Sequence, residues 1–162
     1  MRDLSKYEND YVNLDFEDII VSYRRDEVIS TIEKYKSSKI LEVGCGMEPL
    51  FSFLDDYESF SVVEPSKKFY DNAIKASSGK NNINIYNSTF EDFSKSNENN
   101  YDLIIISGLL HELENPEYFL EDLKSFCTEK TLVHINVPNA LSFHRLLAVE
   151  MGLIKDVYEL SD

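Results

Sequence analysis

The sequence is poor in basic residues. It has 16 Lys and Arg against 30 Asp and Glu in 162 residues, which gives a formal net charge of −14. A field of this sign repels phosphate backbones and anionic bilayers, and no run of Lys or Arg is longer than two residues. Nucleic acid and membrane surfaces are therefore not expected as partners.

Long apolar segments and cysteine pairs are also missing. No stretch approaches the roughly 18 apolar residues of a membrane span, and the first ten residues, MRDLSKYEND, lack the apolar core of a signal peptide. The two cysteines, Cys45 and Cys127, do not have metal-ligand spacing, so neither a disulfide framework nor a metal site is predicted. We expect a cytoplasmic protein in which both cysteines are packed, with a reactive thiol at Cys45 as the alternative.

What the sequence does have is enough apolar material for one domain: 43% apolar residues, with ten Phe and ten Tyr. Short apolar runs alternate with segments of helical periodicity, which predicts an α/β fold. The predicted strands are residues 40–43, 60–63, 83–86, 101–106 and 131–137. Right-handed crossovers then give a three-layer, doubly wound parallel sheet in the order 3-2-1-4-5. Residues 1–37 are predicted to form a helical arm or lid, and residues 38–162 the α/β domain.

The stretch KILEVGCGMEPL, residues 39–50, is the part around which we expect the rest to be organised. Its first half reads as a buried strand that breaks at Gly44, Cys45 and Gly46. Two glycines at that junction let the backbone turn sharply and approach a ligand, although they could also do no more than end a strand. Glu64 closes the next predicted strand, twenty positions after Gly44, where an acid can accept hydrogen bonds from ribose hydroxyls. A nucleotide-like ligand is therefore predicted.

Together, these residues resemble the class I S-adenosylmethionine-dependent methyltransferases. The E-x-G-x-G motif of that family is present as Glu42-Val43-Gly44-Cys45-Gly46, with Glu64 at the end of the second strand. The resemblance implies a Rossmann-like fold, S-adenosyl-L-methionine as the cofactor and methyl transfer as the activity. Met47-Glu48 stands where the family commonly continues with a small residue and a glycine, so the loop shape should differ there. The family core has two more strands, and we expect the chain to be C-terminally short of them, as a natural fragment or a shortened chain.

The resemblance also implies roles for residues after the third and fourth strands. An acid just after the third strand commonly faces the adenine amino group, and either Glu91 or Asp92 fits, beside Phe90 as an aromatic that could stack on the ring. A solvated acidic turn is the alternative. Ser107 should reach the same sheet edge at the end of the fourth strand. The implied cofactor set is Glu42, Gly44, Cys45, Gly46, Glu64, Phe90, Glu91, Asp92 and Ser107.

His111 follows the fourth strand and is the candidate catalytic acid or base, with a structural or positioning histidine as the alternative. In the resembled family an N-terminal arm often covers cofactor and substrate, and residues after the fifth strand should lie near the same edge. His144 with Arg145 could hold an anionic acceptor. The acceptor-site candidates are Tyr23, Arg24, Asn139, His144 and Arg145.

Three phrases late in the sequence, VPNA at 137–140, SFHR at 142–145 and MGLI at 151–154, resemble a subgroup of bacterial methyltransferases. That subgroup is associated with surface-polysaccharide and small-molecule pathways, which implies a small acceptor such as a sugar or phosphoryl-type group. Two alternatives stay open. One is a non-catalytic cofactor-binding or regulatory module of the same fold, and the other is an NAD-dependent oxidoreductase, although Pro49 falls where the NAD fingerprint wants its third glycine.

The apolar fifth strand is expected at or near a sheet edge. Exposed apolar edges are usually covered. We therefore expect the helical segment 140–154, or a second copy of the chain, to shield this strand, and a homodimer through the edge is the hypothesis that follows.

Overall fold

A computed structural model of the chain describes residues 17–97 and 99–158. These residues contain a five-stranded sheet in the order β3-β2-β1-β4-β5, in which all four strand pairs are parallel. Both the α/β class and the strand order are confirmed, and each strand starts and ends within two residues of its predicted bounds. The strands are β1 (Lys39–Val43), β2 (Ser59–Val63), β3 (Ile83–Tyr86), β4 (Leu103–Ser107) and β5 (Leu132–Asn136).

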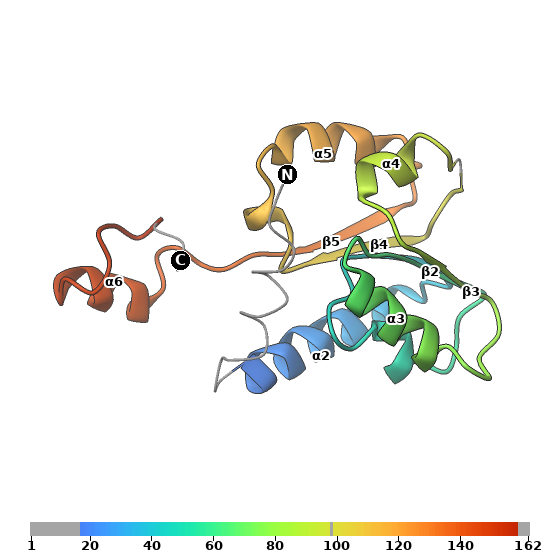
Figure 1. Cartoon of the computed structure of the whole chain (residues 1–162), viewed down its shortest axis with the longest axis horizontal. Helices are drawn as coiled ribbons and strands as arrows, with labels where there is room; N and C mark the ends of the chain where they lie inside the picture. The colour runs from blue at the N-terminus through green and yellow to red at the C-terminus, as the bar shows by residue number, and fades with distance from the viewer. Residues whose placement is uncertain (1–16, 98, 159–162) are drawn as a thin grey trace.

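Helices cover both faces of the sheet (Figure 1). On one face lie α2 (Glu17–Tyr35) and α3 (Lys67–Ala76), and on the other α4 (Phe90–Ser94) and α5 (Pro116–Lys124). Two 3-10 helices, η1 (Leu50–Phe53) and η2 (Leu110–Glu112), follow β1 and β4, and α6 (Phe143–Glu150) follows β5. The acidic segment after β3 is thus helical from Phe90, and the Thr89 hydroxyl caps α4 by accepting a hydrogen bond from the Asp92 N–H.

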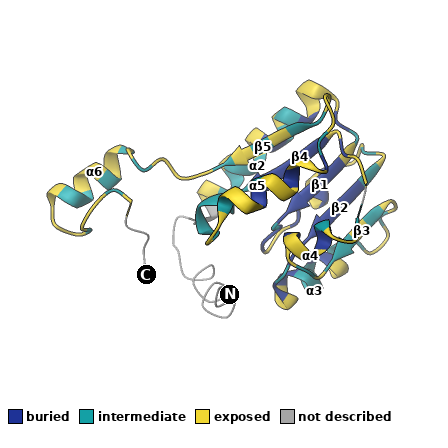
Figure 2. Cartoon of the chain, turned by 90° about the horizontal axis from the view of Figure 1, so that it is seen from above, coloured by how far each residue is buried: buried dark blue, intermediate teal, exposed yellow. Residues whose placement is uncertain are grey.

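The core consists of two apolar layers, one on each side of the sheet (Figure 2). Successive strand residues point to opposite faces. Ile40, Leu103 and Ile105 pack toward α2, whereas Leu41, Ile104 and Ile106 pack toward α4 and α5. Burial on both faces explains why the central strands are continuous apolar runs.

Helix α2 is anchored by its C-terminal half. Val28 and Ile32 are buried in the core, whereas Ile19, Ile20 and Tyr23, nearer the N-terminus, are exposed. Residues 1–16 of the predicted arm lie outside the described residues, so the division of the chain at residue 37 stays a prediction.

Asp102 aligns the amino ends of β1 and β4. One of its carboxylate oxygens accepts hydrogen bonds from the Ser38 N–H (3.1 Å), the Ser38 hydroxyl (3.0 Å) and the Lys39 N–H (3.0 Å). The Lys39 and Ser38 bonds hold the pKa of Asp102 below its ordinary value. With the two strands in fixed register, the loops that follow them leave the sheet next to each other.

The segment after β5 corrects one expectation. Helix α6 is shorter than predicted and projects away from the sheet (Figures 1 and 2), with none of its residues buried. Phe143 is 79% exposed, and Val133 and Ile135 of β5 are exposed as well. The prediction that this helix shields β5 is therefore wrong. Pro138 cannot extend the β-ladder, and the irregular residues 137–139 carry the chain onward instead of back over the sheet.

Candidate functional site

The glycine turn after β1 has the predicted form. Gly44 and Gly46 have φ of 78° and 59°, in the left-handed region that other residues rarely adopt. The Gly44 N–H donates to the Val63 carbonyl at 2.9 Å, which bends the loop toward the end of β2. We call residues 44–46 the Gly loop. Its conformation requires glycine at both positions, which is more than ending a strand would demand.

Glu64, at the end of β2, binds the Gly loop directly. It is 2% exposed. One carboxylate oxygen accepts hydrogen bonds from the Cys45 N–H (3.1 Å) and the Gly46 N–H (3.4 Å), and the other accepts one from the Ser66 N–H (2.8 Å). Burial raises the pKa of Glu64, and the three N–H groups oppose that rise. The strand-end acid therefore binds the Gly loop, while its predicted role toward a ribose stays a prediction.

Glu42 is a second buried acid beneath the same loop. Its two oxygens accept hydrogen bonds from the Leu50 N–H, at 3.1 and 3.3 Å, at the N-terminus of η1. Burial raises the pKa of Glu42 to about 8, and the nearby charge of Glu64 adds to the rise. At neutral pH this carboxyl group is therefore mostly protonated.

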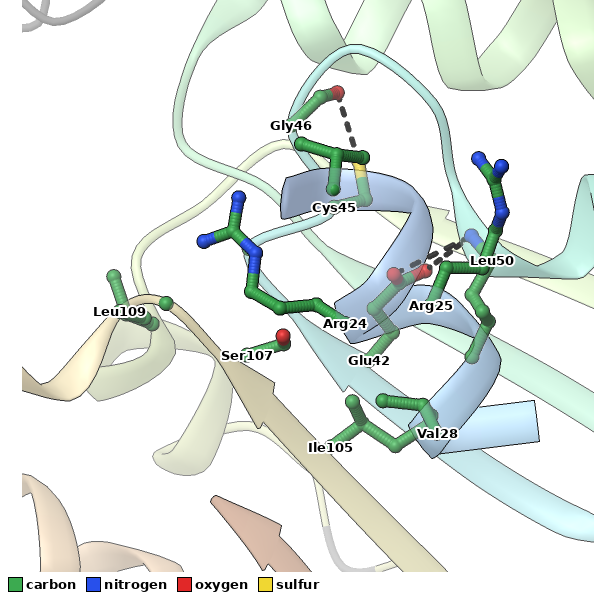
Figure 3. Close-up of a pocket in the computed structure, with 13 residues that line it drawn as sticks. Arg24, Arg25, Val28, Glu42, Cys45, Gly46, Leu50, Ile105, Ser107 and Leu109 are labelled. Atoms are coloured by element: carbon green, nitrogen blue, oxygen red, sulfur yellow. Dashed lines mark hydrogen bonds between the residues drawn. The ribbon is translucent and has the colours of Figure 1, made fainter. Parts of the chain in front are cut away.

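A pocket opens between α2, the Gly loop and the end of β4 (Figure 3). This is the carboxyl edge of the parallel strands, where open α/β sheets bind ligands. Its polar lining comes from Arg24 and Arg25 on α2, Glu42 on β1 and Ser107 at the end of β4. We call it the Gly-loop pocket, and it is lined by Val21, Arg24, Arg25, Val28, Glu42, Gly44, Cys45, Gly46, Leu50, Ile105, Ser107, Gly108 and Leu109.

Arg24 lies over the loop that follows β4. Gly108 has a φ of 71°, and a Cβ atom added to it would lie 2.8 Å from Nη1 of Arg24. The backbone conformation therefore calls for glycine at 108, and any larger residue there would also make the guanidinium group of Arg24 shift. Arg24 was one of the sequence candidates, and the structure places it in the pocket.

Arg25 is a pocket residue that sequence reasoning did not select. Its Nη1 donates to an Oε of Glu48 at 3.2 Å, and its guanidinium carbon lies 3.9 Å from the centre of the Phe53 ring. The adjacent Arg24 and Arg25 could have drawn attention to this position, but Glu48, the partner of Arg25, lies 23 residues away in the sequence. The Met47-Glu48 departure from the family pattern thus supplies an ion-pair partner for α2.

The predicted adenine-side residues do not reach this pocket. Phe90 is buried in an aromatic cluster, with ring centroids 4.7 Å from Phe119 and 5.6 Å from Phe126, so its ring cannot stack on a ligand in this conformation. The physical reason is that α4 packs against α5 through its apolar side chains. Glu91 and Asp92 are exposed on α4, and Asp92 pairs with Lys95 at 3.0 Å. Their role stays a prediction, with the solvated turn the simpler description of what is seen.

Four of the five acceptor-site candidates also lie away from the pocket. Tyr23 is 73% exposed and does not line it. Asn139, His144 and Arg145 lie on the projecting segment that contains α6, where Asn139 Oδ1 accepts from the Leu141 N–H and Arg145 Nε donates to the Val157 carbonyl. These three were expected at the sheet edge and are carried off it by the linker at 137–139.

His111 lies in η2, just after β4, and does not line the pocket. Its Nε2 is 3.9 Å from an Oε of Glu112. Its catalytic role stays a prediction. Ser107, in contrast, does line the pocket, as expected from its place at the strand end.

The thiol of Cys45 is buried, and burial together with Glu42 and Glu64 holds its pKa well above the ordinary value. It therefore stays protonated, which favours the packed interpretation over a reactive thiolate.

Within residues 17–97 and 99–158 no cluster of His, Cys, Asp and Glu could hold a metal ion. In the same part of the chain, no helix combines the length and the apolar character that crossing a membrane requires.

Solved structures of similar fold include the plantazolicin methyltransferase BpumL in complex with a monoazolic desmethylPZN analog and SAH, with a TM-score of 0.66 and 20% identity over 97% of this chain. The N-methyltransferase NodS from Bradyrhizobium japonicum WM9, in complex with SAH, gives a TM-score of 0.54 and 17% identity over 72% of this chain. The methyltransferase domain of bacterial CtHen1-C gives a TM-score of 0.55 and 19% identity over 75% of this chain.

This chain spans 58% of the length of BpumL, 55% of that of NodS and 71% of that of the CtHen1-C domain. A search of curated protein sequences finds no significant match. A family model described as a methyltransferase domain matches residues 20–158, which is most of the chain. The protein therefore belongs to the methyltransferase domain family, as the Gly loop and the strand-end acid predicted.

Proposed function

We propose that the protein is an S-adenosylmethionine-dependent methyltransferase that acts on a small molecule. The observation that carries the proposal is the Gly loop held by the buried Glu64 at the carboxyl edge of a 3-2-1-4-5 sheet. The family match and the SAH-bound structures of BpumL and NodS support the choice of cofactor.

The pocket residues suit the two ends of such a cofactor. S-adenosylmethionine supplies a methyl group on a sulfonium sulfur, and its amino-acid end carries an ammonium and a carboxylate. Arg24, in the pocket lining, offers the charge opposite to the carboxylate, and Glu42, in the same lining, ionises when the positive sulfonium lowers its pKa. The protein has mainly to align donor and acceptor and to exclude water. The apolar wall formed by Val28, Ile105 and Leu109 contributes to that exclusion.

The first prediction concerns cofactor choice. In calorimetric titrations, S-adenosylmethionine and S-adenosylhomocysteine should bind saturably and NAD should not. Glu64→Gln should weaken the binding of both adenosyl compounds by about tenfold or more, because an amide group cannot replace both acceptor oxygens and hydrogen bonds to charged groups contribute about 1.5–3 kcal/mol.

The matched control is Glu58→Gln, at the opposite end of β2, where the carboxylate pairs with Lys39 on the surface. Its affinities should equal those of the wild type. Binding of NAD alone would favour the oxidoreductase alternative. Binding of both adenosyl compounds with no turnover in an acceptor screen would favour a non-catalytic module.

The second prediction follows from the raised pKa of Glu42. A ligand with a positively charged sulfonium favours the ionised carboxylate, so binding should lower this pKa from about 8 and release a proton at pH 7. Affinity for S-adenosylmethionine should therefore rise with pH up to about 8 and then level off. The neutral sulfur of S-adenosylhomocysteine should give a smaller release.

Calorimetry in two buffers of different ionisation enthalpy measures the protons released. Glu42→Gln should abolish the difference between the two ligands, and Glu58→Gln should leave it unchanged. Equal proton release by both ligands in the wild type would contradict the assignment.

We propose for the acceptor a small molecule, with a sugar or phosphoryl-type group of bacterial surface-polysaccharide biosynthesis as the class favoured by the late sequence phrases. The structure of BpumL holds a desmethylPZN analog beside SAH, and NodS is an N-methyltransferase. The protein is expected to act in the cytoplasm and without nucleic acid, on the strength of its composition.

His111 is the proposed general base for an oxygen or nitrogen acceptor. With an acceptor found by screening, His111→Ala should lower kcat at least tenfold, since general acid–base catalysis contributes about 10²–10⁴-fold. The Kd for S-adenosylhomocysteine should stay within about twofold of the wild type. Equal losses in kcat and in cofactor affinity would show a structural role instead.

A homodimer through the β5 edge is the proposed assembly. The support is the exposure of Ile135 and the neutral charge of residues 132–154, which hold one Arg and one Glu in a chain of net charge −14. Self-association at this surface is therefore not opposed by local charge.

In light scattering over a concentration series, Ile135→Lys should lower the average mass toward the monomer. Ile74→Lys, on α3 and similarly exposed, should not, and a wild-type mass that stays monomeric at every concentration would refute the dimer.

A further inference from the structure

Helix α2 forms one wall of the Gly-loop pocket, yet only its C-terminal half is fixed by the core. Val28 and Ile32 are buried, whereas the apolar side chains of Ile19, Ile20 and Tyr23 face solvent. These three side chains therefore contribute little to holding the N-terminal half against the sheet. The pocket residues Arg24 and Arg25 lie just beyond the last buried anchor, Val28. Contacts made by these two residues therefore help to position the helix over the pocket.

Arg25 makes such a contact, and it does so with two groups at once. Its guanidinium donates to Glu48, in the loop after Gly46, and lies 3.9 Å from the ring centre of Phe53 in η1. The side chain of Arg25 is 23% exposed and that of Glu48 is 60% exposed. An ion pair this exposed is weak by itself. The cation–π contact with Phe53 adds to it and restricts the orientation of the guanidinium plane.

Arg24, the neighbour of Arg25, reaches the other side of the pocket. Consecutive residues of an α-helix point about 100° apart, and Arg24 lies against Gly108 after β4 while Arg25 lies against the loop after β1. Figure 3 shows the two guanidinium groups directed to different sides of the pocket. One helical turn therefore bridges the ends of two strands across the site.

We infer that Arg25, Glu48 and Phe53 form a clasp that fastens α2 over the Gly-loop pocket, with Arg25 as a positioning residue. The clasp holds Arg24 at Gly108 and keeps the pocket closed on the α2 side. Release of this surface contact lets the N-terminal half of α2 move more easily, while Val28 and Ile32 keep the rest of the helix in the core. Helix α2 is thus a lid. Weak contacts of Arg25 hold its N-terminal half over the pocket, and its buried C-terminal half acts as the hinge. Its consequence for cofactor binding rests on the proposed function.

Hydrogen exchange tests the clasp without any ligand. In Arg25→Gln and in Glu48→Gln, the amides of residues 19–27 should exchange about 3- to 10-fold faster than in the wild type, as expected for loss of a weak local contact. Amides of β1 and β4 should be unaffected. The matched control is Lys39→Gln, which breaks the exposed Lys39–Glu58 pair (3.1 Å) at the opposite end of β1 and should change nothing in α2.

Binding of S-adenosylhomocysteine supplies the second readout. Each single variant should raise the dissociation rate by about 3- to 10-fold, and the double variant should raise it no further, because both substitutions remove the same interaction. Arg25→Lys should fall in between, since an ammonium group keeps the charge but not the planar stacking on Phe53.

Two results would overturn the clasp: α2 exchange in Arg25→Gln equal to that of the wild type, or effects of the single variants that add in the double variant. If the wild type does not bind S-adenosylhomocysteine at all, the proposed function fails, and the exchange experiment still decides whether the clasp exists.

Discussion

The hydrogen bonds of one buried carboxylate, that of Glu64, fix the part of the structure on which the site depends. A carboxylate taken out of water is costly unless its oxygens are hydrogen-bonded, and here three backbone N–H groups from two different loops supply those bonds. The bonds to Cys45 and Gly46 join the end of β1 to the end of β2. The Ser66 N–H at the start of α3 ties the same carboxylate to the next helix. The Gly loop is therefore specified by an interaction as well as by its glycines.

The same carboxylate also contributes to the electrostatics beneath the Gly loop. Glu42 lies under the loop as well, and the proximity of Glu64 adds to the desolvation that raises its pKa. Two buried acids next to each other favour a neutral Glu42 when the pocket holds no cation and an ionised one when it does. Arg24 and Arg25 bring positive charge from the opposite side. The site thus offers both signs of charge at short range, which the overall charge of −14 does not reveal.

Sequence patterns predicted the parts of the fold that depend on burial. The runs that became β1, β2 and β4 are apolar because both sheet faces are covered, and the glycines at 44 and 46 are needed for their positive φ. The spacing of apolar residues and the positions of glycines are local properties that can be seen directly in a sequence. The strand order then followed from the handedness of the connections, and the strand-end position of Glu64 from the length of one strand–helix–strand unit.

The misses share a different origin. Phe90 was assigned to a ligand because it neighbours two acids, but which way a five-residue helix turns its aromatic side chains is decided by α5, about 25 residues further on. Arg25 was passed over because Glu48 and Phe53 become its neighbours only after β1 has formed. The projecting segment was expected to fold back because its apolar periodicity is helical. Periodicity predicts a helix and does not say where the linker at 137–139 directs it.

The site has two halves that differ in how firmly they are packed. The half formed by the Gly loop, Glu42 and Glu64 is buried, hydrogen-bonded and joined to the central strands. The other half is the N-terminal part of α2, where the apolar side chains of Ile19, Ile20 and Tyr23 are exposed. Regions with few buried contacts open at low free-energy cost, and loops that select ligands are drawn from such regions. Because a shared fold does not fix the ligand that such loops select, the acceptor has to be identified by experiment and not by analogy with proteins of the same fold.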